Sequence, residues 1–224
     1  MTDQAISISG ERLRLLPERA LFWEREGALI VADLHWGKAA TFRAAGVPLP
    51  PGTTTDDLAR LDRALARTGA SRLYLLGDLF HAREGRRATA TLAAAAAWRA
   101  EHPLLEVLLV RGNHDRAAGD PPAELGMTVV DAPHHIAPFA LHHEAPRSAA
   151  AGYTLAGHLH PGFVVSGPGR QRERLACFVI GRRGALLPAF GSFTGTLAVE
   201  AAPDDRVFVI AGDAVIPVSP AAYR

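Results

Sequence analysis

The stretch that decides the fold is ALIVADLH, at residues 28–35. It opens with an apolar run that includes Ile30 and Val31, which is typical of a buried strand. The run ends at Asp33 and His35, two residue types that bind metal ions. Because open α/β sheets bind ligands at the carboxyl ends of their strands, this stretch predicts a strand with metal ligands at its end.

Three further polar clusters follow apolar runs in the same way. The runs are residues 73–76, 107–110 and 153–156, and the clusters after them are Gly77-Asp78, Gly112-Asn113-His114-Asp115 and Gly157-His158-Leu159-His160. Any one cluster alone would fit a hydrogen-bonded turn. Together, at four predicted strand ends, they indicate one metal centre.

The ligand types indicate which chemistry such a centre supports. Hydrolysis of a phosphate ester needs a hydroxide near neutral pH and neutralisation of charge on the phosphoryl oxygens. Two divalent cations, about 3.5–4 Å apart and bridged by a carboxylate, meet both needs. Oxygen and imidazole ligands without a thiolate suit Mn²⁺, Fe²⁺ or Zn²⁺.

Composition sets the class of protein. A chain of 224 residues with 48% hydrophobic and 21% charged residues predicts one globular domain over residues 1–224. The single cysteine, Cys177, leaves no internal disulfide and favours a reducing compartment. The first residues show no signal-peptide pattern and no apolar run is long enough for a membrane span, so we expect a cytoplasmic protein without a membrane partner.

The order of predicted elements changes along the chain. Leucines at helical spacing predict a helix over residues 56–67, with Thr55 as its N-cap, and an alanine-rich helix is expected over residues 89–102. Strands alternating with helices indicate an α/β half. Beyond Met127 closely spaced strand candidates predict a second sheet, and residues 166–174 are expected to form an exposed loop.

The clusters, in this order, resemble the signature of the calcineurin-like metallophosphoesterases. The resemblance implies a four-layer αββα sandwich, two mixed sheets flanked by helices, with two divalent metal ions. It implies that one metal takes Asp33, His35 and His160, that the other takes Asn113, His158 and a further histidine, and that Asp78 bridges them. It also implies that His114 acts catalytically at the leaving group, with Asp115 orienting it.

The further histidine has two candidates, His142 and His143. The His-Glu pair followed closely by a proline resembles the nearest subgroup, so His143 is preferred.

A finer resemblance extends over most of the chain. Residues 33–43, 77–81, 157–161 and 187–195 look like the bacterial ligase-associated DNA damage response phosphoesterases, called PdeM. That subgroup is regarded as manganese-dependent DNA nucleases encoded beside a helicase, a DNA ligase and an exonuclease. The resemblance therefore implies a Mn²⁺-dependent DNA nuclease in DNA repair, with those enzymes as functional partners. It does not predict an oligomeric state.

Other polar side chains are candidates for substrate contact. His81 lies close in sequence to the bridging aspartate, and Lys38, the only lysine, and Arg43 could approach a phosphate or simply form a solvated helix face. Arginines in residues 84–87, 166–174 and 182–183 are candidates for contacts to a nucleic-acid backbone.

Two other functions compete with the nuclease. A phosphodiesterase or pyrophosphatase acting on a nucleotide or nucleotide-lipid would use the same centre, although no amphipathic basic helix for lipid capture is evident. A non-catalytic protein-binding scaffold would keep the fold but usually loses ligands, and here every expected ligand is present.

Overall fold

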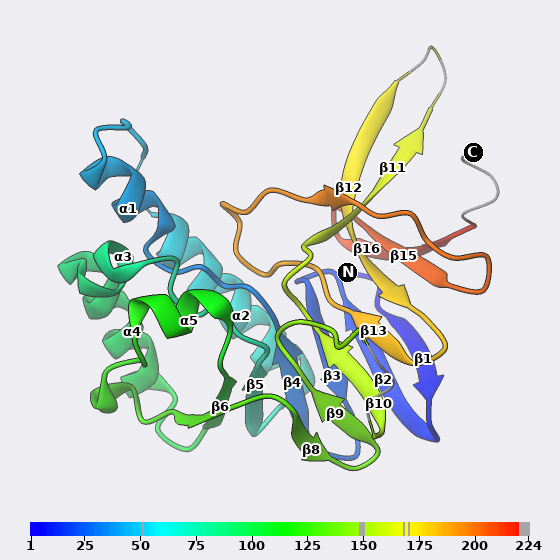
Figure 1. Cartoon of the computed structure of the whole chain (residues 1–224), viewed down its shortest axis with the longest axis horizontal. Coiled ribbons are helices and arrows are strands. Elements are labelled where there is room, and N and C mark those ends of the chain that lie inside the picture. Colours follow the sequence, from blue (N-terminus) through cyan, green and yellow to red (C-terminus); the bar gives the residue numbers. More distant parts are fainter. Residues whose placement is uncertain (51, 148–150, 168, 170, 220–224) are drawn as a thin grey trace.

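The computed structural model describes residues 1–50, 52–147, 151–167, 169 and 171–219. Two mixed β-sheets pack face to face, and helices lie against the first of them (Figure 1). This confirms the predicted sandwich of two mixed sheets flanked by helices, although the described helices cover the first sheet only and the described residues form no fourth, helical layer on the second. Among the described residues, no helix combines the length and apolar character needed to cross a membrane.

The first sheet follows chain order from β1 to β7. Its strands are β1 Gln4–Ile8, β2 Glu11–Leu16, β3 Ala20–Trp23, β4 Ala28–Val31, β5 Arg72–Leu75, β6 Glu106–Val110 and β7 Thr128–Val130. Strands β1 to β4 pair antiparallel, whereas β4 to β7 pair parallel, with Leu29 opposite Leu73 and Leu73 opposite Val107. The parallel strands bring the ends of β4, β5 and β6 to one edge, so the first three clusters meet there.

The described helices all come from the connections between β4 and β7. They are α1 Lys38–Ala44, α2 Thr53–Thr68, α3 Arg83–Arg87, α4 Thr89–Glu101, α5 Asn113–Ala118 and the 3-10 helix η1 Ala123–Leu125. Leu58, Leu61 and Leu65 of α2 and Trp98 of α4 are buried against the outer face of the first sheet. Helix α2 begins after Gly52, so the prediction of Thr55 as its N-cap is wrong; Thr55 lies inside the helix and donates to the Gly52 carbonyl.

The second sheet has the order β14-β11-β12-β13-β10-β9-β8, with β15 paired to β12 and to β16. Its strands are β8 His134–Ile136, β9 Phe139–Leu141, β10 Tyr153–Ala156, β11 Pro161–Ser166, β12 Arg172–Ile180, β13 Gly184–Leu186, β14 Leu197–Ala198, β15 Arg206–Ala211 and β16 Ala214–Val218. Strand β10 runs parallel to both β9 and β13. An apolar layer between the two sheets includes Trp23, Phe139 and Phe178 and fixes how the sheets face each other.

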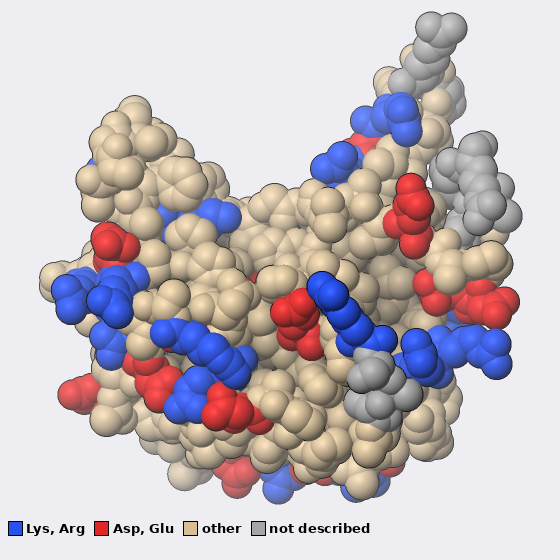
Figure 2. Space-filling model, viewed as in Figure 1, with Lys and Arg blue, Asp and Glu red and all other residues tan. Residues whose placement is uncertain are grey.

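The expectation of a loop over residues 166–174 is wrong in part. Ser166 ends β11 and Arg172 begins β12, so the segment belongs to an antiparallel hairpin that projects from the body (Figure 1). Arg174 lies within β12, and Arg170 lies outside the described residues. The space-filling view shows the surface hollowed between α1 and this hairpin (Figure 2).

Candidate metal centre

Two groups of ligand atoms converge where the ends of the two sheets meet. Asp33, His35 and His160 form one group, and Asp78, His143 and His158 form the other, each with ligand atoms within 4.8 Å of one another. Asp33, His35 and Asp78 follow β4 and β5 of the first sheet, while the other three histidines follow β9 and β10 of the second. The predicted ligands are therefore brought together from both sheets.

The backbone at these positions is unusual. Seven described residues other than glycine have a positive φ, and five of them are predicted ligands: Asp33, His35, Asp78, His158 and His160. Left-handed backbone is costly for residues with a Cβ and concentrates at functional sites. Each strand turns abruptly at its end, and the turn points the side chain that follows into the centre.

Two glycines leave room for this convergence. A Cβ on Gly112 would overlap Asp78 Oδ1, and a Cβ on Gly77 would overlap the His143 ring. Gly77 also has φ +79°, which side chains other than glycine rarely adopt. Each of these two glycines thus leaves room for a predicted ligand that follows another strand.

Asp78 lies between the two groups. Its Oδ2 is 3.8 Å from His35 Nε2 and 3.4 Å from His143 Nε2. Within the first group, His35 Nε2 is 3.3 Å from His160 Nε2, which in turn is 3.6 Å from Asp33 Oδ1. Ligand atoms about 2.0–2.2 Å from a shared cation lie between about 3.0 and 4.4 Å apart, depending on the angle between them, so this spacing fits a cation in each group and a bridging Asp78.

His143, not His142, occupies the second group. His143 Nε2 is 2.9 Å from Asn113 Oδ1 and 3.0 Å from His158 Nδ1. His142 is buried, and its Nε2 has no hydrogen-bond partner among the described residues. The geometry therefore agrees with the choice of His143 over its neighbour, and it also places Asn113 in the group.

Backbone carbonyls set the tautomers of the imidazoles. His143 Nδ1 lies 2.9 Å from the Leu76 carbonyl and His160 Nδ1 lies 3.2 Å from the Gly195 carbonyl. A carbonyl only accepts, so each Nδ1 carries the proton and each Nε2 turns a lone pair toward the centre. Asp33 Oδ1 is buried without a hydrogen-bond partner in the described chain, as expected of an oxygen that awaits a cation.

Burial dominates the electrostatics of the centre. It lowers the pKa of His35 to about 2, with His160 and His114 adding to the shift, so this imidazole is neutral and free to bind a metal. Burial also raises the pKa of Asp78, with the charge of Asp33 adding to the shift and His143 and His114 opposing it. A bound cation opposes that shift and favours the ionised carboxylate.

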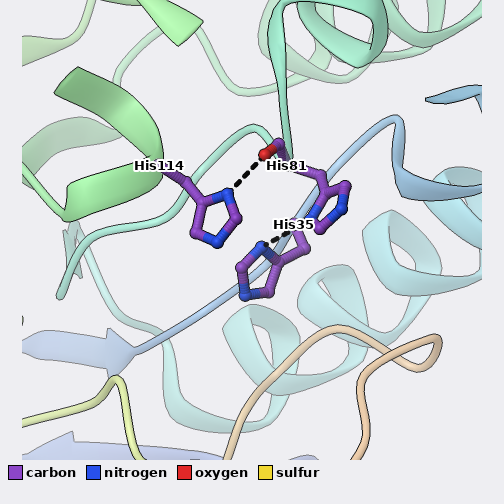
Figure 3. Close-up of side chains that lie close together, drawn as sticks. All are labelled: His35, His81 and His114. Atoms are coloured by element: carbon purple, nitrogen blue, oxygen red, sulfur yellow. Dashed lines mark hydrogen bonds between the residues drawn. The ribbon is translucent and has the colours of Figure 1, made fainter. Parts of the chain in front are cut away.

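His81 contacts both His35 and His114 (Figure 3). Its Nδ1 is 3.4 Å from His35 Nδ1, and its carbonyl accepts from His114 Nδ1. Burial, then Lys38, lowers the pKa of His81 to about 4, so the ring is neutral. Held in this way, His114 turns Nε2 toward the centre, 4.0 Å from Asp78 Oδ2.

The prediction that Asp115 orients His114 is wrong. The Asp115 carboxylate is buried and accepts from the backbone N–H groups of Asp78, Leu79 and Gly112 at 2.7–2.9 Å. It therefore joins the loop after β5 to the start of α5. The carbonyl of His81 orients the His114 ring instead.

The remaining candidates for substrate contact lie at different places. Lys38 begins α1, three residues after His35, and its Nζ lies 5.8 Å from the Phe193 ring centroid. Arg43 is exposed and donates to the carbonyls of Leu49 and Pro50 at 3.2–3.4 Å, so its guanidinium is used within its own loop. Arg86 likewise donates to the Asp120 carbonyl.

The segment 188–195 lies against the centre, although none of its residues was a predicted ligand or catalytic group. Gly191 N donates to the Asp33 carbonyl, and the Gly195 carbonyl accepts from the predicted ligand His160. Asp57 of α2 accepts from Ser192 N at 2.9 Å and so fixes this segment to the helix. The one sequence signal for it was the subgroup motif at residues 187–195.

Comparison with known proteins adds independent findings. The family model of the calcineurin-like phosphoesterases matches residues 28–148. The crystal structure of Pseudomonas putida nuclease MPE is 46% identical, covers 97% of this chain and 100% of that chain, and has a TM-score of 0.83. YfcE, a phosphoesterase from E. coli, is 14% identical over 88% of this chain and 94% of that chain, with a TM-score of 0.42. No curated protein matches the chain significantly.

Proposed function

Because the chain belongs to the calcineurin-like phosphoesterase family and is a metal-dependent phosphoesterase, we propose that its substrate is DNA and that its metal ions are Mn²⁺. We propose that two metal ions are bound, because Asp78 Oδ2 lies within 3.8 Å of ligand atoms of both groups. Likeness to a Pseudomonas putida nuclease over 97% of the chain supports a nucleic-acid substrate, and the resemblance of residues 33–43, 77–81, 157–161 and 187–195 to the DNA damage response subgroup favours DNA.

The residues divide the work of hydrolysis. Asp33, His35 and His160 would hold one cation, Asn113, His143 and His158 the other, and Asp78 both. When bound, such a pair of cations supplies Lewis acidity and lowers the pKa of water. Carboxylate, amide and imidazole donors without a thiolate suit Mn²⁺, and Fe²⁺ or Zn²⁺ are the alternatives.

His114 assists at the leaving oxygen. Its Nδ1–H is occupied by the His81 carbonyl, so only Nε2 is free to exchange a proton with a substrate. The ring is half-buried beside Asp78, where a phosphodiester between the two ligand groups would meet it. When Nε2 is protonated as well, its proton passes to the departing alkoxide of the broken ester and leaves a neutral ring that keeps its Nδ1–H on the His81 carbonyl.

A metal and substrate panel tests this function. The protein is stripped with a chelator, reloaded with Mn²⁺, Mg²⁺, Zn²⁺ or nothing, and offered labelled DNA, RNA, nucleotides and an aryl phosphodiester. We expect DNA cleavage that is greatest with Mn²⁺ and absent without metal. Hydrolysis of nucleotides without DNA cleavage would instead favour a small-molecule phosphodiesterase, and no hydrolysis would favour a scaffold.

An active-site variant completes the test. Asp78→Ala should lower both DNA and aryl phosphodiester hydrolysis about 10³-fold or more, because the bridging ligand of both cations is lost. Asp56→Ala, which removes an exposed carboxylate of α2, serves as the matched control. Retention of either activity in Asp78→Ala would remove Asp78 from its bridging role.

A further inference from the structure

Two phenylalanines are exposed beside the metal centre. Phe42 of α1 is 36% exposed and Phe193, in the segment 188–195, is 37% exposed, and they are the only exposed Phe, Trp or Tyr side chains in the described part of the chain. Their ring centroids lie 5.9 Å apart with the planes at 85°. The two residues are 151 positions apart in sequence, and the fold places their exposed rings side by side.

Stacked side chains connect the Phe42–Phe193 pair to His114, the residue assigned to proton transfer. Phe42 stacks on His81 at 6.2 Å with an interplanar angle of 27°, and His81 stacks on His114 at 4.9 Å and 24°. The three rings form a column with nearly parallel planes, from the exposed surface to the imidazole that faces Asp78. His81 and His114 are the inner part of this column (Figure 3).

Phe193 is held in place by the centre itself. Gly191 N donates to the Asp33 carbonyl at 3.1 Å, and the Gly195 carbonyl accepts from His160 Nδ1 at 3.2 Å. Both sides of Phe193 are thus tied to residues of the first ligand group. A rigid aromatic loses little conformational entropy when it contacts a ligand, so this arrangement suits binding.

Lys38 adds charge to the apolar surface. Its Nζ lies 5.8 Å from the Phe193 centroid, a cation–π distance. An aromatic face beside an ammonium group matches a nucleotide, which has an apolar base and an anionic phosphate. A phosphodiester in the centre carries a nucleoside on each side, so one base lies within a nucleotide of His114.

We propose that Phe42 and Phe193 form a stacking site for the nucleobase next to the phosphodiester that is cut. The proposal rests on the proposed function of the chain as a DNA nuclease. In this proposal the pair strengthens substrate binding. The base must also be unpaired when it occupies the site, because a base stacked inside a duplex has no free face.

A double-mutant cycle tests the site: one change removes an aromatic ring from the protein and the other removes the bases beside the phosphodiester. Two oligonucleotide probes each contain one phosphodiester among methylphosphonate linkages. One probe has thymine on both sides of the phosphodiester, and the other has abasic tetrahydrofuran residues there. The proteins are the full chain loaded with Mn²⁺ as wild type, Phe42→Leu and Phe193→Leu, with metal content measured for each. Leu104→Ala, which truncates a 91% exposed side chain two residues before β6 begins, is the control.

If the rings stack on a base, the losses in kcat/KM from removing the ring and from removing the base should not be additive. Wild type should lose about tenfold in kcat/KM on the abasic probe, which corresponds to about 1.4 kcal/mol. Each Phe→Leu variant should lose a similar factor on the thymine probe and less than about twofold more on the abasic probe. The control should keep the full difference between probes.

Two outcomes overturn the proposal in distinguishable ways. If the variants lose the same factor on both probes, the rings do not contact a base, while the nuclease function stands. If wild type hydrolyses an aryl phosphodiester but cuts neither probe nor unmodified DNA, the nuclease function fails and the stacking site falls with it. Because Phe42 contacts His81 and Phe193 contacts Lys38, two separate variants guard against a local disturbance at either position.

Discussion

Asp57→Ala tests the support behind the segment that closes the metal centre. Asp57 is only 4% exposed, accepts from Ser192 N at 2.9 Å and pairs with Arg60 Nη2 at 2.7 Å. The same Nη2 donates to the Phe190 carbonyl, so Arg60 is tied to both partners. Burial raises the pKa of Asp57 and lowers that of Arg60, and each charge is stabilised in part by the other.

The expected loss follows from these contacts. Two hydrogen bonds to a charged carboxylate are worth about 1.5–3 kcal/mol each, and breaking a buried ion pair by removing one partner costs about 3–5 kcal/mol. We therefore expect Asp57→Ala to lower the free energy of unfolding by about 3–5 kcal/mol. The adjacent Asp56→Ala, an exposed carboxylate at the start of the same helix, should cost less than about 1 kcal/mol.

Urea denaturation of the metal-free proteins, followed by circular dichroism, measures both losses. The slope of unfolding should be unchanged while the Asp57→Ala midpoint falls. Equal losses for Asp57→Ala and Asp56→Ala would refute the reasoning, because the buried pair would then contribute nothing beyond helix-end electrostatics. Asp57→Leu combined with Arg60→Met removes both charges and should recover much of the loss.

His114→Ala should lower turnover about 10²- to 10⁴-fold while metal content, measured by mass spectrometry, stays near two per chain, because this imidazole is assigned to proton transfer; loss of metal would reassign it as a ligand. Cys177 is fully buried and burial raises the pKa of its thiol to about 12, so a thiol reagent at pH 8 should label it only in denaturant; fast labelling of the native protein would contradict its placement. Arg172→Gln with Arg174→Gln should weaken DNA cleavage and flatten its salt dependence, since both lie exposed on the projecting hairpin, whereas Arg63→Gln on α2 should not; an equal loss on an aryl phosphodiester would exclude a role in DNA contact.

Continuous apolar runs made much of the framework predictable. Residues 28–32 are all buried and residues 107–110 are buried except for the partly buried Leu108, so both runs carry a strong strand signal, and β4 and β6 lie there. The clusters that follow them come together as expected, because parallel strands align their carboxyl ends. Helix α4, predicted over residues 89–102, spans Thr89–Glu101.

Other features depend on contacts that no local pattern shows. Helix α5 begins at Asn113, and its first turn is stabilised by Asp115, which the sequence pairs just as naturally with the neighbouring His114. The hairpin of β11 and β12 projects into solvent, so Ser166 and residues 172–174 are exposed and lack the alternating buried face that marks a strand. The pairing of Phe42 with Phe193 requires the fold, since nothing in either local sequence refers to the other.

The origin of the ligands from both sheets has a consequence for folding. Asp33, His35 and Asp78 come from the first sheet, and His143, His158 and His160 from the second. A divalent cation bound among them is a cross-link between the two layers, and its binding energy adds to their cohesion. Loading at a hundredfold excess over Kd would contribute about 2.7 kcal/mol of stability per site. Metal supply would then set the lifetime of the protein as well as its rate of catalysis.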